Sequence, residues 1–375
     1  MFSKIFLIIK DFFIILGNIN KINSSNAKFV FYSEGKSYQK YAYLIIEYLS
    51  KRFPGQVHYV SSEKNDCFLK LDVINTFIGN NFFLQYFFKT IKTDNLFITL
   101  TDLNNSIIKR NRFVKNYIYY FHGSVSTTKV YTESAFDNYD TVLCNGNYHY
   151  NEIRKRENLA HLKSKKLVKS GFYYFDYLNI KKNELINKPD EILIAPSWNK
   201  NKTNFINDDF QTIIENLLKS GFKIRFRPHP ETLKRSPKLM TYYKYKFKGN
   251  NFIFDEDSEN LTALNNAKCL ITDNSGISIE FALIFKKPII YYDDFDKVHN
   301  TKFDMYSDMD TMENKVKNKF GKKFSKNQIL NINEIINNSL YNFDENEIDS
   351  FLNENFYNFS KKKDFFEKNF SIICI

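Results

Sequence analysis

"TDNSGISIEFALIFKKPIIYYDD", residues 272–294, contains the pattern that decides the fold. An apolar run, residues 269–271, stops at the polar residues 273–276, and a nearly all-apolar segment follows at once. After Lys286-Lys287-Pro288 a second apolar run covers residues 289–292. We interpret the stretch as a buried strand, a turn, a helix and another buried strand. This unit is typical of a parallel sheet with helices between its strands.

The same alternation extends in both directions along the chain. Before the quoted stretch, the sequence predicts strands at 28–35, 56–62, 95–103, 116–123, 139–146, 191–198, 222–230, 251–257 and 268–275. Amphipathic helix patterns lie between several of them, for example at 38–53, 147–159 and 208–220. At 375 residues the chain is too long for one ordinary core. We therefore predict two doubly wound, Rossmann-like α/β domains that face a cleft.

The predicted boundaries give four parts. They are an apolar N-terminal helix at 1–20, an N-terminal domain at 21–180, a C-terminal domain at 190–340, and a C-terminal helical segment at 341–375 that packs back across the junction.

The charge restricts the possible partners. The net charge is +12, which suits an anionic substrate or an anionic membrane surface as well as an ordinary solvated surface. No zinc spacing, RNA-binding motif or basic helix is present, so nucleic acid is not an expected partner. The histidines form no metal-ligand cluster. Asp293-Asp294 follows a strand pattern but forms no Asp-x-Asp signature, so we expect no metal and no cofactor.

The N-terminal segment is apolar over residues 2–17 but is interrupted by Lys10-Asp11. A transmembrane helix needs about 20 mostly apolar residues, and a signal peptide needs a small-residue cleavage site. The segment has neither feature. Two alternatives stay open: a helix that lies in the membrane interface, or one packed on its own domain. The expected location is cytoplasmic, with possible peripheral attachment to the cytoplasmic membrane face.

The turn at residues 273–276 has the features of an anion site. Ser275 or Ser278 could cap the following helix, and Gly276 would let a phosphate approach backbone N–H groups at the helix start. A plain strand-to-helix turn without a ligand is the alternative. Glu280 falls in the first turn of that helix, where it could bind ribose hydroxyls or complement the helix dipole.

The stretch "KIRFRPHP", residues 223–230, supports the hypothesis of an anion site. Strand alternation places Arg225 and Arg227 on one face, opposite the apolar residues. Two prolines hold His229 at the end of the strand, beside Arg227. Both side chains can donate charge-assisted hydrogen bonds to phosphate oxygens. The alternative is a structural histidine that caps a turn. A third motif, His122-Gly123, follows a strand in the N-terminal half.

Together these motifs resemble the CDP-glycerol glycerophosphotransferase family, which makes teichoic-acid-like and capsule polymers. The matching pieces, in order over about residues 115–296, are Phe121-His122-Gly123, "SGFYYFDYL" (170–178), "ILIAPSW" (192–198), Arg227-Pro228-His229-Pro230 and "LITDNSGISIEFALIFKKPIIYYDDFD" (270–296). The resemblance implies a GT-B-type fold of two domains. It also implies that Arg227, His229, Ser275 and Gly276 hold the donor pyrophosphate and that His122 serves the acceptor hydroxyl.

The complete predicted site adds neighbours of these residues. Catalytic roles are expected for His122 and His229, and acceptor-side roles for Gly123 and Ser124. The donor site is expected to contain Arg227, Asn274, Ser275, Gly276, Ser278 and Glu280.

The implied reaction moves glycerol phosphate from CDP-glycerol to a hydroxyl of an anionic or lipid-linked polymer and releases CMP. Here Phe121 stands where the family usually has Trp, Tyr173-Tyr174 stand for Pro-Arg, and Ser275-Gly276 and Glu280 replace two serines and an aspartate. A GT-B glycosyltransferase that uses a CMP- or UDP-sugar therefore stays open, as does a non-catalytic assembly protein of a polysaccharide machine.

Overall fold

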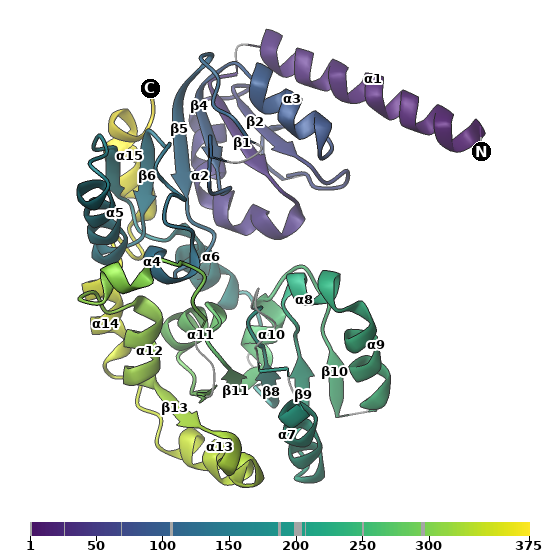
Figure 1. Cartoon of the computed structure of the whole chain (residues 1–375), viewed down its shortest axis with the longest axis vertical. Coiled ribbons are helices and arrows are strands. Elements are labelled where there is room, and N and C mark those ends of the chain that lie inside the picture. Colours follow the sequence, from purple (N-terminus) through teal and green to yellow (C-terminus); the bar gives the residue numbers. More distant parts are fainter. Residues whose placement is uncertain are drawn as a thin grey trace. The chain divides into compact units, whose positions relative to one another are not determined.

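The computed structural model describes residues 2–25, 27–68, 70–105, 108–186, 189–198, 205–206, 208–249, 251–293 and 297–375. The chain divides into two compact units (Figure 1). Unit 1 comprises Met1–His122, Tyr131–Tyr177 and Asn355–Ile375, and unit 2 comprises Gly123–Val130 and Leu178–Glu354. Each unit therefore includes a segment that lies outside its main stretch of sequence.

Unit 1 is built on a parallel sheet. Within the described residues it has seven strands in the order β3-β2-β1-β4-β5-β6-β7, and Phe31 of β1 is in register with Tyr59 of β2 and Phe97 of β4. The strands are β1 (Phe29–Ser33), β2 (Val57–Ser61), β3 (Ile74–Phe77), β4 (Thr93–Ile98), β5 (Val114–Tyr120), β6 (Thr141–Cys144) and β7 (Lys166–Lys169). The strand order reverses between β1 and β4, which is the doubly wound arrangement.

Helices separate these strands. They are α1 (Phe2–Ser24), the 3-10 turn η1 (Lys36–Tyr38), α2 (Gln39–Arg52), α3 (Phe82–Thr90), α5 (Asn147–Leu159), α6 (Tyr173–Lys182) and α15 (Lys362–Ile373). The α2 helix matches its predicted range and buries Ala42, Ile45, Ile46 and Leu49 on one face. The α6 helix begins in unit 1 and ends in unit 2.

Unit 2 repeats the arrangement with a second parallel sheet. In the part of the chain that the structure describes, this sheet has six strands in the order β10-β9-β8-β11-β12-β13. They are β8 (Glu191–Ile194), β9 (Lys223–Phe226), β10 (Phe252–Phe254), β11 (Ala267–Thr272), β12 (Ile289–Tyr292) and β13 (Gly321–Phe324). The order reverses between β8 and β11. The predicted fold class of two doubly wound α/β domains is confirmed.

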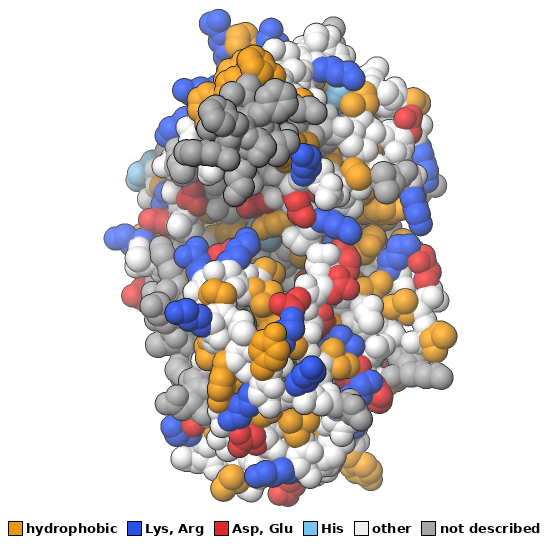
Figure 2. Space-filling view, turned by 90° about the vertical axis from the view of Figure 1, so that its right-hand side faces the viewer, with side chains coloured by type: hydrophobic (Ala, Val, Ile, Leu, Met, Phe, Trp, Pro, Cys, Tyr) orange, Lys and Arg blue, Asp and Glu red, His pale blue; other side chains and the backbone are white. Residues whose placement is uncertain are grey.

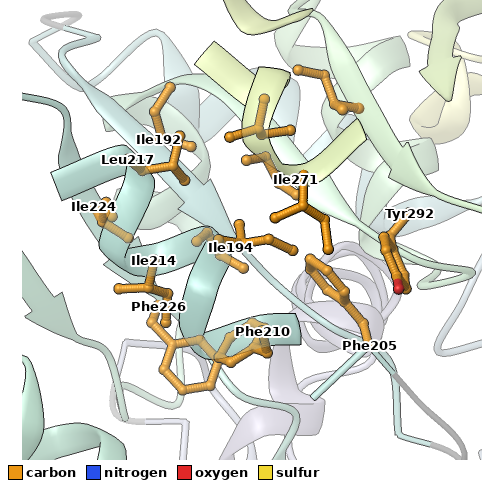
Figure 3. Close-up of a cluster of buried hydrophobic side chains, with 14 of the residues drawn as sticks. Ile192, Ile194, Phe205, Phe210, Ile214, Leu217, Ile224, Phe226, Ile271 and Tyr292 are labelled. Carbon is orange, nitrogen blue, oxygen red and sulfur yellow. The ribbon is translucent and has the colours of Figure 1, made fainter. Parts of the chain in front are cut away.

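The helices of unit 2 are α4 (Thr127–Val130), α7 (Asp208–Lys219), α8 (Pro230–Arg235), α9 (Pro237–Lys246), α10 (Leu261–Asn266), α11 (Ile277–Phe285), η2 (Phe303–Tyr306), α12 (Met312–Phe320), η3 (Lys326–Asn331), α13 (Ile332–Tyr341) and α14 (Ile348–Asn355). Figure 3 shows Ile192 and Ile194 of β8 beside Ile214 and Leu217 of α7 in one buried cluster. Leu193, between them, is also fully buried, so β8 is covered on both faces.

The two ends of the chain both contribute to unit 1. Ile15, Ile19 and Ile22, in the second half of α1, are buried. Among the described residues, no helix is both long and apolar enough to cross a bilayer. At the other end, Phe366 and Ile373 of α15 join the core that contains Phe29 and Phe31.

Two features of the C-terminal half differ from the sequence analysis. The single helical pattern predicted near the C-terminus is two helices, α14 and α15, separated by residues 356–361. The region after His229, for which no element was predicted, forms α8 and α9 with Pro230 and Pro237 in their first turns. Proline is favoured at that position because its missing N–H needs no partner there.

Candidate functional site

The predicted donor turn lies at the carboxyl end of β11, where the strand order of the second sheet reverses. Open α/β sheets bind ligands at this kind of switch point. Asn274, Ser275, Gly276 and Ile277 are partly exposed, whereas the residues on both sides of them are buried. The start of α11 is therefore open to a ligand, and helix N-termini favour anions.

The predicted capping serines do not cap α11, so that expectation was wrong. Gly276 occupies the N-cap position, and among the described residues no side chain caps this helix. The buried hydroxyl of Ser278 instead donates to the carbonyl of Ser275 at 2.7 Å. Ser278 thus braces the turn from inside, and no capping oxygen competes with an anion for the first amides of the helix.

Asp273 and Ser197 connect the ends of β8 and β11 behind the turn. The Asp273 carboxylate accepts hydrogen bonds from the backbone N–H of Ser197 at 2.7 Å and from its hydroxyl at 2.9 Å. Burial raises the pKa of Asp273, although the hydrogen bonds from Ser197 and the charge of Lys297 oppose that rise. Together the two residues fix the direction in which the chain leaves the sheet.

Lys297 is a lysine at this edge that the sequence analysis did not identify. Burial lowers the pKa of its ammonium, and the carboxylates of Asp273 and Glu313 oppose the shift. Two residues further on, the ring of His299 lies 5.8 Å from that of Trp198, which follows β8. The segment that begins at Lys297 therefore lies across the carboxyl ends of β8 and β11.

The segment after His122 is part of unit 2. A Cβ atom added to Gly276 would lie 3.1 Å from Cγ1 of Val125, so this segment packs directly against the donor turn. The N–H of Ser126 donates to Oε2 of Glu313 at 3.0 Å, and the Ser126 hydroxyl accepts from the N–H of Met312 at 2.8 Å. Gly123 and Ser124, predicted on the acceptor side, thus belong to the unit that holds the donor turn.

Arg227 follows β9 and is held by acidic partners. Its guanidinium lies 3.0 Å from Asp255 and donates to the carbonyl of Asp257 at 2.7 Å. Arg225 lies on the same side of the strand and contacts Asp255 at 3.4 Å and Glu191 at 2.6 Å. The predicted alternation is confirmed, since Ile224 and Phe226 enter the core on the opposite side. Of the two arginines, Arg227 lies nearer to the carboxyl end of β9.

His229 is the N-cap of α8, which was the structural alternative in the sequence analysis. Its Nδ1 accepts a hydrogen bond from the N–H of Glu231 at 3.1 Å. In a neutral imidazole an accepting Nδ1 places the proton on Nε2, so Nε2–H is a donor. Capping therefore presents the kind of group that a phosphate oxygen binds, and the two roles are compatible.

Glu280 is buried within α11 and accepts a hydrogen bond from the side-chain amide of Asn260 at 3.3 Å. Asp293 pairs with Lys317 and Lys323, and Asp294 lies outside the described residues. The described part of the chain contains no group of three or more His, Cys, Asp or Glu side chains that could hold a metal ion.

His122 follows β5 and is the last residue of unit 1 before the chain enters unit 2. Its side chain is partly buried, and loss of contact with water lowers its pKa to about 4. Nδ1 of His122 has no hydrogen-bond partner among the described residues. The ring is therefore neutral near pH 7, and its unpartnered Nδ1 atom is buried. Every other predicted site residue belongs to unit 2.

Two Rossmann-like units in one chain define a fold of the GT-B type. The chain matches the model of the CDP-Glycerol:Poly(glycerophosphate) glycerophosphotransferase family over residues 18–363. It therefore belongs to that family, as the motifs indicated, and it is a transferase. A search of curated proteins found no match to the chain.

Solved structures show the same fold. The wall teichoic acid polymerase TagF is similar with a TM-score of 0.63 and 14% identity, over 99% of this chain and 96% of that chain. A variant of that polymerase soaked with CDPG gives a TM-score of 0.62 at 14% identity, over 99% and 95%. UDP-GlcNAc 2-epimerase from Methanocaldococcus jannaschii, in complex with UDP-GlcNAc and UDP, gives 0.60 at 15% identity, over 92% and 99%.

Proposed function

We propose that this protein transfers glycerol phosphate from CDP-glycerol to a hydroxyl at the end of a teichoic-acid-like or capsule polymer and releases CMP. The observation that carries the proposal is the uncapped, partly exposed start of α11 with Gly276 at its N-cap, in a chain of the glycerophosphotransferase family. The soaked structure of TagF, with its CDPG, supports the same class of donor.

The donor pyrophosphate is expected to lie at the first turn of α11. Its negative charge would be met by the helix N-terminus, by Arg227 and by Nε2–H of His229, which are all at the carboxyl edge of the second sheet. Lys297 lies at the same edge, where its protonated form would add a further positive charge. Asn274 and Ser275 line the turn, whereas the buried Ser278 and Glu280 support it.

The reaction needs little covalent help from the protein. A hydroxyl oxygen of the acceptor forms a bond to the phosphorus that carries glycerol, the bond from that phosphorus to the bridging oxygen breaks, and CMP leaves with the bond electrons. The hydroxyl proton passes to the neutral imidazole of His122. Positioning and charge stabilisation dominate phosphoryl transfer of this kind, and histidine is a common proton acceptor.

A donor panel tests the proposal. Purified protein is incubated with a glycerol-phosphate oligomer and with CDP-glycerol, CMP-sugars or UDP-sugars in turn, and the released nucleotide is measured. We expect CMP release from CDP-glycerol alone. Release of UDP or CMP from a sugar nucleotide, without turnover of CDP-glycerol, would establish a GT-B glycosyltransferase instead.

The reaction is proposed to proceed without a metal, because Arg227, His229 and the start of α11 would together offset the charge of the pyrophosphate. Turnover should then persist in excess EDTA. Loss of turnover in EDTA, with recovery on addition of Mg²⁺, would contradict this.

We also propose that unit 1 attaches peripherally to the inner face of the cytoplasmic membrane, where a lipid-linked acceptor would be found. Phe13 of α1 is 68% exposed and Phe82 of α3 is 61% exposed. Phe12 joins them, since its ring lies 5.7 Å from Phe13 and 5.4 Å from Phe83. Figure 2 shows hydrophobic side chains gathered at the top of this face. Exposed apolar patches of this kind mark interaction surfaces.

The membrane proposal predicts that the protein pellets with vesicles that contain phosphatidylglycerol. Replacing both Phe13 and Phe82 by Ser should leave it in the supernatant. Tyr341→Ser is the control, because that side chain is 89% exposed but lies in unit 2. Equal pelleting of the double variant and the native protein would exclude this patch.

A further inference from the structure

The loop that follows β1 is built to hold one aromatic side chain against His122. The Ser33 hydroxyl donates to the carbonyl of Gly35 at 2.9 Å, and the Lys36 N–H donates to Oε2 of Glu63 at 2.9 Å. A Cβ atom on Gly35 would lie 2.5 Å from the same Glu63 oxygen, so any larger residue would push the end of the Glu63 side chain aside. The N–H of Tyr38 donates to the carbonyl of Gly35 at 2.9 Å and closes the turn.

The result is a cluster of three rings. The ring centroid of His122 lies 5.5 Å from that of Tyr38 and 6.1 Å from that of Tyr41, and the two tyrosine rings are 6.3 Å apart. Tyr41 is supported from behind by the fully buried Tyr174, whose ring is 4.7 Å away. His122, Tyr38 and Tyr41 are all partly exposed, so a ligand can reach their rings, whereas the Nδ1 atom of His122 itself is buried.

The cluster lies at the carboxyl ends of the strands of the first sheet. Tyr38 and Tyr41 follow β1, beside the point where the strand order reverses, and His122 follows β5. Ligands bind open α/β sheets at this edge. The unpartnered Nδ1 of His122 shows that the cluster includes a polar atom which nothing in the described part of the chain satisfies. Buried polar atoms normally have partners, so a ligand is expected there.

The chemistry of the cluster selects a neutral ligand. Burial alone accounts for the lowered pKa of His122, and the ammonium of the nearby Lys40 lies over the ring of Tyr41, 5.5 Å from its centroid. Aromatic faces carry partial negative charge and pack well on C–H groups, so they would disfavour a phosphate. A hydroxylated carbon chain, in contrast, offers C–H groups to the rings and a hydroxyl to the imidazole.

We infer that Tyr38 and Tyr41 form the binding site for the terminal polyol or sugar unit of the acceptor, and that they place one of its hydroxyls at His122. This inference rests on the proposed transfer to a polymer hydroxyl, and it assigns to the loop after β1 the choice of the acceptor end. The two tyrosines are binding residues. The proton goes to His122.

The test compares Tyr38→Ala and Tyr38→Phe with the native protein, and uses Tyr43→Ala as a matched control. Tyr43 is also a partly buried tyrosine of α2, but it packs on Phe68 and Tyr177. With CDP-glycerol and a soluble glycerol-phosphate oligomer, Tyr38→Ala should raise the acceptor KM about ten-fold, while the affinity for CDP-glycerol stays unchanged. Tyr38→Phe, which keeps the ring, and Tyr43→Ala should behave like the native protein.

A pH profile gives a readout that a merely structural loss would not move. Removing the Tyr38 ring admits water to His122, so the acid limb of kcat should shift from about pH 4 towards the ordinary histidine value of about 6.5. An unchanged acceptor KM and an unchanged acid limb in Tyr38→Ala would overturn the inference, as would an equal loss in Tyr43→Ala.

A binding measurement separates the inference from the proposed function. The imidazole resonance of His122, assigned with His122→Asn, is followed by NMR while the glycerol-phosphate oligomer is added. If the native protein releases no CMP from CDP-glycerol, the proposed donor fails. A perturbation of the His122 resonance that disappears in Tyr38→Ala would still support the polyol site. Absence of any perturbation in the native protein would refute it.

Discussion

Replacing Arg227 by Ala should lower both stability and donor turnover, and the contacts of Arg227 indicate the size of each effect. Asp255, 6% exposed at its side chain, is paired with Arg227 at 3.0 Å and with Arg225 at 3.4 Å. When Arg227 is removed, the Asp255 carboxylate keeps only Arg225 as an arginine partner. We therefore expect a loss of about 1–3 kcal/mol in the free energy of unfolding. Loss of a charge-assisted contact to the transition state should lower kcat/KM by about 10²–10³-fold.

Arg225→Ala is the matched control. The two arginine side chains are equally buried, at 14% and 13% exposure, and they share Asp255. Arg225 also pairs with the buried Glu191, so its loss should cost more stability, about 3–5 kcal/mol. It lies within β9 and not beyond its end, so donor affinity per folded molecule should be unchanged.

Urea denaturation gives the stability of each variant, and titration with CDP at a temperature where both are folded gives donor affinity. If Arg225→Ala weakens CDP binding as much as Arg227→Ala, the effect comes from the shared ion-pair network, and Arg227 is not a donor ligand. Native-like turnover in Arg227→Ala would refute the assignment outright.

Three further predictions concern the same reaction. His229→Asn keeps an N-cap acceptor for α8, so the unfolding free energy should change by less than about 1 kcal/mol while turnover collapses. Retained turnover would show that His229 only caps the helix and does not take part in the reaction. Gly276→Ala should weaken CDP binding at least ten-fold with little change in the melting temperature, because its methyl group displaces only the Val125 side chain. Gly249→Ala is the control, since a Cβ atom there meets nothing closer than 3.9 Å. Equal CDP affinity in the two variants would contradict the anion site. Since the folded-state pKa of His122 is lowered to about 4, the imidazole stays neutral until the pH falls near that value, so kcat should fall only below about pH 5; an acid limb at about 6.5 in the native protein would show that His122 is not the group that titrates.

The elements that the sequence predicted well are those with long apolar runs. The β11–α11–β12 unit is buried on all sides, so its residues are apolar almost throughout, and its polar turn stands out. The β13 strand was missed because Gly321-Lys322-Lys323-Phe324 has a single apolar side chain at the edge of the sheet. The α8 and α9 helices were missed because their first-turn prolines look like helix breakers in a sequence.

The candidate site could be proposed from the sequence where one short stretch carries the chemistry. The donor turn and the Arg227–His229 stretch are local motifs, and they were identified from the sequence. Lys297 and Tyr38 were not, because an isolated lysine after a strand and a tyrosine before an amphipathic helix are ordinary in sequence. Their significance depends on Asp273 and His122, which only the fold brings to them.

The position of residues 355–375 has a consequence for biosynthesis. Phe366 and Ile373 complete the core of unit 1, and the backbone carbonyl of Ile375 accepts a hydrogen bond from the Asn95 side chain at 3.0 Å. During translation, α15 is therefore synthesised only after all of unit 2, so the first strands of unit 1 lack this packing partner until then. Unit 2 in turn needs residues 123–130 from the middle of unit 1. No uninterrupted fragment therefore contains one whole unit without part of the other, and unit 1 lacks its last core residues for most of its synthesis.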